Sequence, residues 1–235
     1  SLWVDPLGWA ALRLLNGIAM VGIFMVVESW LNAQTPVGLR GRVFATYMIS
    51  TLLALGAGQF IILSYDPAGS ELFALVTLLT ILGLIPIAIT RMTEPVIEAP
   101  QAMGLKRLFR VSPLGTLGAF GAGLVNGLFW GLTPVFAQRL DMSTEQIALL
   151  MSAVIAGGAL LQYPIGLLSD RYDRRTVLVL VSLSAAALAG SVAGLVWSHV
   201  PGLFVVSFLY GGLMFAIYGL AVAHTNDRLT TGHTL

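Results

Sequence analysis

The sequence predicts an all-α protein, a polytopic bundle of transmembrane helices. Of its 235 residues, 57% are hydrophobic and only 10% are charged, whereas soluble domains have about 25% charged residues. Nearly all of these charges lie between seven long apolar stretches, each close to the roughly 20 residues with which a helix crosses the hydrocarbon core. Because so little polar surface is available, a water-soluble enzyme is excluded.

The same composition excludes several other classes of protein. A net charge of +1 provides no basic face for nucleic acid. The absence of cysteine removes disulfide frameworks and thiol catalysis. The three histidines, His199, His224 and His233, do not have metal-site spacing. The sequence therefore predicts no cofactor, no metal and no nucleic-acid partner, and it names the lipid bilayer as the first partner.

Three predicted spans come first, over residues 7–27, 43–64 and 72–90. The first is apolar except for Arg13 and Asn16, which lie three residues apart and so share a helix face. An arginine within a span usually faces a bundle interior or a watery cavity, but Arg13 lies about 9 Å from the outer helix end and can also snorkel to the interface. Both interpretations stay open.

The longest connection, residues 92–114, divides the chain. It begins polar and proline-bearing and continues as the basic, apolar stretch from Lys106 to Arg110. This stretch is either an amphipathic segment on the cytoplasmic leaflet or an ordinary cytoplasmic linker. Both interpretations make it the boundary between a first helix bundle, residues 1–91 with three spans, and a second, residues 115–235 with four.

The last four predicted spans cover residues 115–137, 146–168, 176–197 and 202–223. In the first of these, Asn126, Trp130 and Thr133 are spaced i, i+4 and i+7, which places a polar and aromatic stripe on one helix face. Such a stripe suits a cavity for a small polar solute or hydrogen bonds between helices. Gly123, Gly127 and Gly131 form a small-residue row expected to let helices approach closely. Gln162 and Tyr210, in later spans, are weaker cavity candidates.

Basic residues predict the orientation. Ten of the 12 lie in alternate connections, and Arg139 alone lies in the opposite set. Lys and Arg concentrate on the cytoplasmic side of membrane proteins, so the connections that carry the ten are expected to be cytoplasmic. The ten are Arg40, Arg42, Arg91, Lys106, Arg107, Arg110, Arg171, Arg174, Arg175 and Arg228.

A charged motif follows the fifth span. It contains Gly166, Asp170, Arg171, Arg174 and Arg175. This pattern resembles the cytoplasmic signature of the major facilitator superfamily, although Asp173 stands where that signature usually has Gly. Asp170 can pair with Arg174 or Arg171 at the membrane edge. A pair formed in one conformation and broken in another would act as a conformational gate, whereas a solvated charge run contributes only about 0–1 kcal/mol.

Further stretches strengthen the resemblance. The segment from Trp9 through Arg13 to Gly17 is similar to the superfamily's fourth-helix signature, and residues 26–29, 40–43, 47–48 and 163–166 resemble its YcaD-like bacterial inner-membrane branch. The resemblance spans essentially the whole chain. It implies an internal fragment with helices four to ten of twelve, three being expected before Ser1 and two after Leu235. It also implies that Arg13 faces a central cavity and that the multi-pass protein lies in the inner (plasma) membrane.

The expected function is secondary transport of a small solute by alternating access, not catalysis. Glu28, at the inner end of the first span, is either a proton-coupling group or a rim partner of Arg40 or Arg42. Protons are thus a candidate coupling ion. Sugars, nucleosides, organic anions and amphipathic drugs fit the mostly uncharged stripe about equally. The alternative is a non-transporting seven-helix receptor or scaffold; a retinal protein would need a buried lysine, and Lys106 in the linker is the only one.

Overall fold

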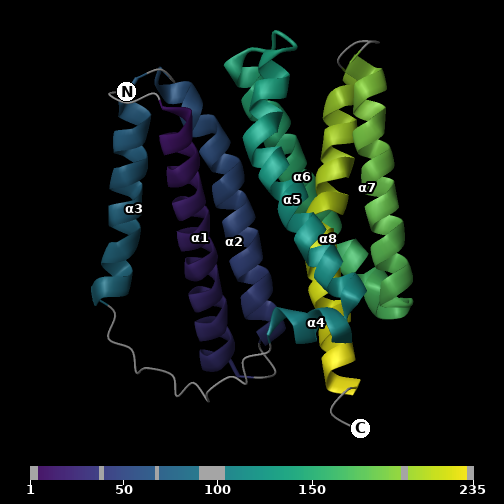
Figure 1. The fold of residues 1–235 in the computed structure, drawn as a ribbon. Coiled ribbons are helices and arrows are strands. Elements are labelled where there is room, and N and C mark those ends of the chain that lie inside the picture. The colour runs from purple at the N-terminus through teal and green to yellow at the C-terminus, as the bar shows by residue number, and fades with distance from the viewer. Residues whose placement is uncertain (1–4, 37–39, 67–68, 90–103, 197–200, 232–235) are drawn as a thin grey trace. The chain divides into compact units, whose positions relative to one another are not determined.

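The structure is a computed structural model that describes residues 5–36, 40–66, 69–89, 104–196 and 201–231. These residues form α-helices and one 3₁₀ turn, with no strand among them, which confirms the predicted all-α class (Figure 1). The elements are α1 (Pro6–Gln34), α2 (Arg40–Ile61), η2 (Ile62–Ser64), α3 (Glu71–Ile89), α4 (Leu105–Val111), α5 (Pro113–Gln138), α6 (Thr144–Arg171), α7 (Arg174–Val196) and α8 (Pro201–Thr231).

Each of the seven predicted spans corresponds to a helix. Within the described chain, six of these helices are long and apolar enough to cross a membrane, namely α1, α2, α5, α6, α7 and α8. The apolar part of α3, Glu71–Pro86, is shorter. Several helices extend past the predicted ends; α8, for example, continues beyond Ala223 to Thr231. Backbone hydrogen bonding continues past the apolar stretch, where side chains such as Asp227 and Arg228 are exposed.

The chain divides into two compact units. Unit 1 comprises Ser1–Ser50 and Tyr65–Gln101, and unit 2 comprises Thr51–Ser64 and Ala102–Leu235. In unit 1, Asp5 caps α1 by accepting a hydrogen bond from the backbone N–H of Gly8 at 2.7 Å. Large apolar side chains are exposed along α1 and α3, as expected of helices that face lipid. The division into residues 1–91, 92–114 and 115–235 remains a prediction.

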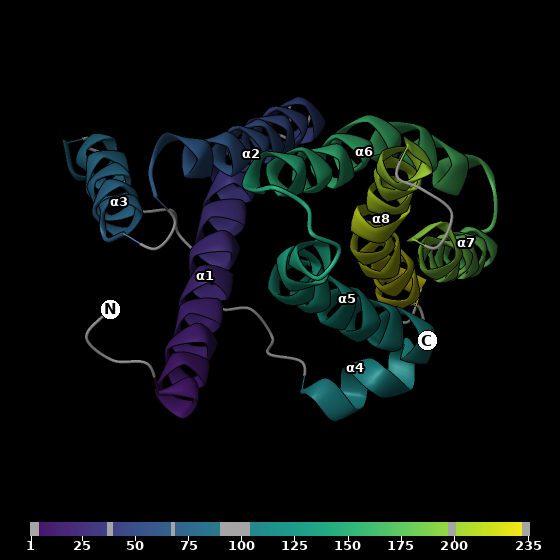
Figure 2. The same cartoon turned by 90° about the horizontal axis from the view of Figure 1, so that it is seen from above.

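Unit 2 is built around α8. This helix packs against α5, α6 and α7, and Figure 2 shows it between them. One buried cluster joins α5, α7 and α8 around Leu178 and Ala221. A second joins α5, α6 and α8, where the ring of Phe129 lies beside Met151 and Met214. The central position of α8 explains why apolar residues are buried on several of its faces.

Glycines allow α6 and α8 to cross closely. A Cβ atom on Gly157 would collide with the carbonyl group of Phe208, and one on Gly211 would collide with the carbonyl group of Val154. Among the described residues, a Cβ on Gly123, Gly127 or Gly131 of α5 would meet no atom within 4 Å, so the close contact expected of this row remains a prediction. Spacing alone identifies small residues, but burial selects the ones that form the crossing.

The short helix α4 runs across the beginning of α5 and the end of α8 (Figures 1 and 2). Ser112, only 1% exposed, is the single residue between α4 and α5. Its backbone N–H donates to Leu108 at 2.9 Å, and its carbonyl accepts from Thr116 at 2.9 Å. Pro113 then starts α5, where its missing N–H costs nothing. Residues 92–103 of the predicted linker lie outside the described part of the chain.

Candidate functional site: a charged cluster at the ends of three helices

A polar cluster centres on Arg174, the first residue of α7. Its Nη2 atom donates a hydrogen bond to Oδ1 of Asp170 on α6 at 3.1 Å, and its Nε atom lies 3.4 Å from Oδ2 of Asp227 on α8. The Arg174 side chain is 30% exposed, and those of Asp170 and Asp227 are 66% and 55% exposed. Water therefore screens both ion pairs. One guanidinium links the ends of three helices.

Asp173 caps the start of α7. Its Oδ2 atom accepts hydrogen bonds from the backbone N–H and from the hydroxyl of Thr176, both at 2.9 Å. These two bonds lower the pKa of the Asp173 carboxyl below its usual value, and the nearby His224 adds a smaller effect in the same direction. Within the described chain, Asp141 is the only non-glycine residue with a positive φ. Asp173 thus replaces the signature's glycine with a helix cap, and the turn needs no left-handed residue.

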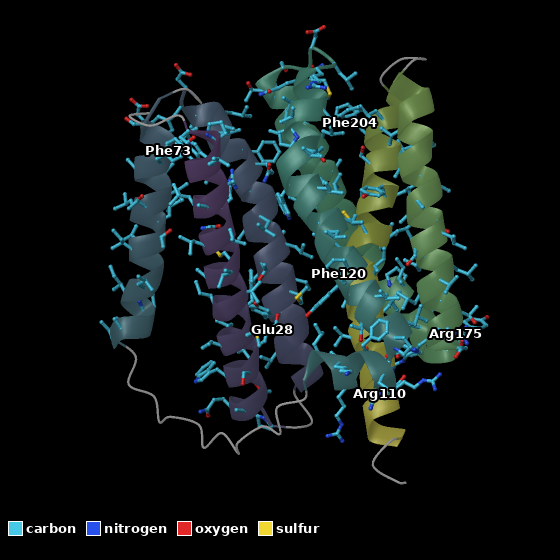
Figure 3. The ribbon with its side chains drawn as sticks, viewed as in Figure 1. Glu28, Phe73, Arg110, Phe120, Arg175 and Phe204 are labelled. Atoms are coloured by element: carbon cyan, nitrogen blue, oxygen red, sulfur yellow. The ribbon has the colours of Figure 1, made fainter. Side chains whose placement is uncertain are left out.

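The structure brings together three of the five predicted gate residues. Gly166, Asp170 and Arg174 line a cavity of about 200 Å³ between α6 and α8. Arg171 and Arg175 are exposed, and neither forms an ion pair with another described residue; Figure 3 shows Arg175 at the same end of the bundle as Arg110. Of the two partners that the sequence left open for Asp170, Arg174 is the one it contacts.

The three residues of the predicted stripe on α5 have different surroundings in the described part of the chain. The Nδ2 atom of Asn126 donates to the carbonyl of Ala122 in its own helix at 3.0 Å. Trp130 packs edge-on against Phe129, with ring centroids 4.9 Å apart. Thr133 borders a cavity of about 190 Å³ within unit 2, which Tyr210 also lines. The roles of Asn126, Trp130 and Thr133 in solute binding remain predictions.

The predicted site residues of unit 1 lie on α1. Arg13 and Asn16 are both exposed and occupy the same helix face. Glu28 is exposed near the end of α1 (Figure 3). The side chains of Arg40 and Arg42, its predicted rim partners, lie outside the described part of the structure.

Comparison with known families matches residues 2–234 to the model of the Major Facilitator Superfamily. The chain belongs to this superfamily. Its apolar helices are accordingly membrane spans, and the protein is a multi-pass membrane protein. Within the described residues, no group of three or more His, Cys, Asp or Glu side chains is placed to hold a metal ion.

Several curated relatives carry the same name, "uncharacterized MFS-type transporter YcaD". The chain is 29% identical over 232 residues to that of Escherichia coli O7:K1 and 27% identical over 233 residues to that of Escherichia fergusonii. These matches cover 97% and 98% of this chain but 59% of each relative. The chain therefore spans less than two thirds of the length of these superfamily members. No solved structure matches it.

Sequence reasoning missed Asp227, which is 53 positions from Arg174. Their contact depends on how α8 packs against α7, and a single sequence contains no direct signal for that packing. One signal was available: the last span ends on the side that the positive-inside rule assigns to the 171–175 loop, so an acidic residue there is near a basic cluster. Gln162, a weaker candidate, lines the same cavity as Arg174.

Proposed function

We propose that this chain is part of a secondary transporter that moves a small solute across the bacterial inner membrane by alternating access. The observation that carries the proposal is the superfamily match over residues 2–234. Such a transporter rocks two helix bundles around a site near the middle of the membrane. The match favours transport over the alternative of a non-transporting receptor or scaffold.

The cluster around Arg174 is the proposed gate, on the cytoplasmic side. It ties α6, α7 and α8 together through Asp170 and Asp227, so a relative movement of these helix ends must lengthen at least one of the two pairs. Each exposed pair contributes about 0.2–1 kcal/mol. Losing both would shift a conformational equilibrium by roughly 2- to 30-fold, since 1.4 kcal/mol corresponds to tenfold. A bias of this size suits a gate that has to open in every cycle.

The proposed solute contacts are Arg13 and Asn16 from α1 and the Asn126, Trp130 and Thr133 stripe from α5. Arg13 carries five N–H donors in a planar fork, which matches a carboxylate or phosphate. The stripe supplies an amide, an indole and a hydroxyl group, which could contact an uncharged polar part of the solute. The solute class that combines both features is a small organic anion with polar groups.

Glu28 is the proposed coupling group in this chain. It is the only carboxylate residue in α1 and is exposed. Protons are therefore the proposed coupling ion.

The test uses the full-length protein reconstituted in liposomes with an inward proton gradient. A panel of sugars, nucleosides, organic anions and amphipathic drugs is screened for uptake, and Arg13→Ala is compared with Leu12→Ala, a neighbouring exposed position. We expect uptake of an organic anion, its loss in Arg13→Ala and normal uptake in Leu12→Ala. If no solute moves, the transporter proposal is wrong. If Arg13→Ala transports normally, Arg13 has no place in the site.

A further inference from the structure

A groove of about 650 Å³ lies where α4 meets α5 and α8, away from the proposed gate. Its walls are mainly the apolar side chains of Leu105, Leu108, Phe109, Leu117, Phe120 and Val222. Leu105 is 73% exposed and Phe120 is 65% exposed, so the groove opens to the surroundings. Its volume is within the range of about 300–1,000 Å³ that is typical of small-molecule sites.

The two hydroxyl groups that line the groove are already hydrogen-bonded within the protein. The hydroxyl of Thr116 donates to the carbonyl of Ser112 at 2.8 Å, and that of Thr225 donates to the carbonyl of Ala221 at 2.8 Å. Neither hydroxyl therefore requires a hydrogen bond from an occupant. The groove is suited to an apolar chain.

Three cations flank this apolar groove. Lys106, Arg107 and Arg110 lie on the seven-residue helix α4, and all three are exposed. None forms an ion pair with another described residue. The nearby carboxylates of unit 2 at this end of the bundle are engaged elsewhere, because Asp170 and Asp227 pair with Arg174 and Asp173 caps α7. The cations are free for an external anion.

The direction of α4 adds a geometric argument. It runs across the ends of α5 and α8, and because those helices are membrane spans, α4 lies in the plane of the membrane surface (Figures 1 and 2). Figure 3 shows Arg110 at this end of unit 2 and Phe120 on α5 further along the bundle. A ligand that reaches from the cations into the groove therefore extends from the membrane surface towards its interior.

We propose that this groove binds an anionic phospholipid, with its phosphate on Lys106, Arg107 and Arg110 and an acyl chain against α5 and α8. The ligand combines the two features that the site presents, a negative charge at the surface and an apolar tail beneath it. The bound lipid would hold α4, and with it the start of α5, at the membrane surface.

The test is native mass spectrometry of the full-length protein in detergent, with phosphatidylglycerol and phosphatidylcholine of identical acyl chains as probes. We expect phosphatidylglycerol to bind more tightly. Replacing Lys106, Arg107 and Arg110 together by Gln should weaken its binding roughly 100-fold, at roughly fivefold for each cation. The matched control replaces Arg139, Arg171 and Arg175 by Gln, which removes the same charge elsewhere, and should retain most of the binding.

A second pair of variants tests the groove itself. Leu117→Asn puts an amide into the groove, and Leu124→Asn puts one at a similarly exposed position two turns further along α5. Leu117→Asn should weaken phosphatidylglycerol binding roughly tenfold, and Leu124→Asn should leave it unchanged. Inorganic phosphate should not displace the lipid. Equal binding of both lipids, equal loss in both charge variants, or unchanged binding in Leu117→Asn would each overturn the proposal.

Discussion

Because α6 and α8 cross closely, we expect a larger side chain at the crossing to lower the stability of the folded protein. Gly157→Ala adds one methyl group, which would collide with the carbonyl oxygen and carbon of Phe208. The obstacle is backbone, so no side chain can rotate away to relieve it. The helices must move apart or bend. We therefore expect Gly157→Ala to destabilise the protein although alanine is the better helix former.

The magnitude follows from two opposing effects. Overpacking a well-packed interior costs about 1–3 kcal/mol, whereas Gly→Ala within a helix gains up to about 1 kcal/mol. Gly127 on α5 provides the matched control, because a methyl group there would meet no atom of the described residues within 4 Å. The propensity gain is common to both variants. The difference in stability between Gly157→Ala and Gly127→Ala should therefore be about 1–3 kcal/mol.

The assay is reversible unfolding of the full-length protein in mixed micelles of a mild detergent and sodium dodecyl sulfate, with tryptophan fluorescence as the readout. Gly157→Ala should unfold at a lower dodecyl sulfate fraction than wild type, and Gly127→Ala at an equal or higher one. Gly211→Ala, on the opposite side of the crossing, should behave like Gly157→Ala. Equal stability of Gly157→Ala and Gly127→Ala would refute the close approach of the two helices.

Two further predictions concern unit 2. Phe129→Ala should destabilise the protein by about 3 kcal/mol in the same unfolding assay, since Phe129 is 4% exposed and packs against Trp130 and Phe215. Leu128→Ala, at an exposed position, should cost far less. Asp173→Ala should speed amide exchange in the first turn of α7 at neutral pH. Because the folded pKa of Asp173 is lowered, its stabilising effect is present above the unfolded pKa of about 3.9 and disappears as the pH falls through the folded value. The difference from wild type should vanish in strong acid, while Asp173→Asn, which retains an acceptor, should show little pH dependence.

The positions of the helices are predictable from the sequence because the bilayer sets a minimum apolar length and excludes charge from it. Their ends are less predictable. The last span was expected to stop at Ala223, where the apolar run ends, but α8 continues to Thr231. The hydropathy of the sequence indicates where the hydrocarbon core of the membrane ends, whereas the end of a helix depends on capping and on backbone hydrogen bonds.

The candidate site was predictable only in part, for a related reason. The Asp170–Arg174 pair joins residues four positions apart across a short turn, so local spacing suffices to predict it. The contact between Arg174 and Asp227 depends on the packing of α7 against α8, which spacing does not contain. The same limit applies to the glycines: Gly157 and Gly211 form the crossing because their faces are buried, and burial is a property of the assembled bundle.

The arrangement around Arg174 has a consequence for the proposed gate. Arg174 and Arg175 occupy the first two positions of α7, where the helix dipole disfavours positive charge. Asp170, Asp173 and Asp227 surround this helix start and offset the effect. Carboxylates of the same unit therefore compensate the positive charge at this helix start, and no counter-ion from elsewhere is needed. Because its pairs are also exposed, breaking them returns the charges to water at little cost, as a gate that opens repeatedly requires.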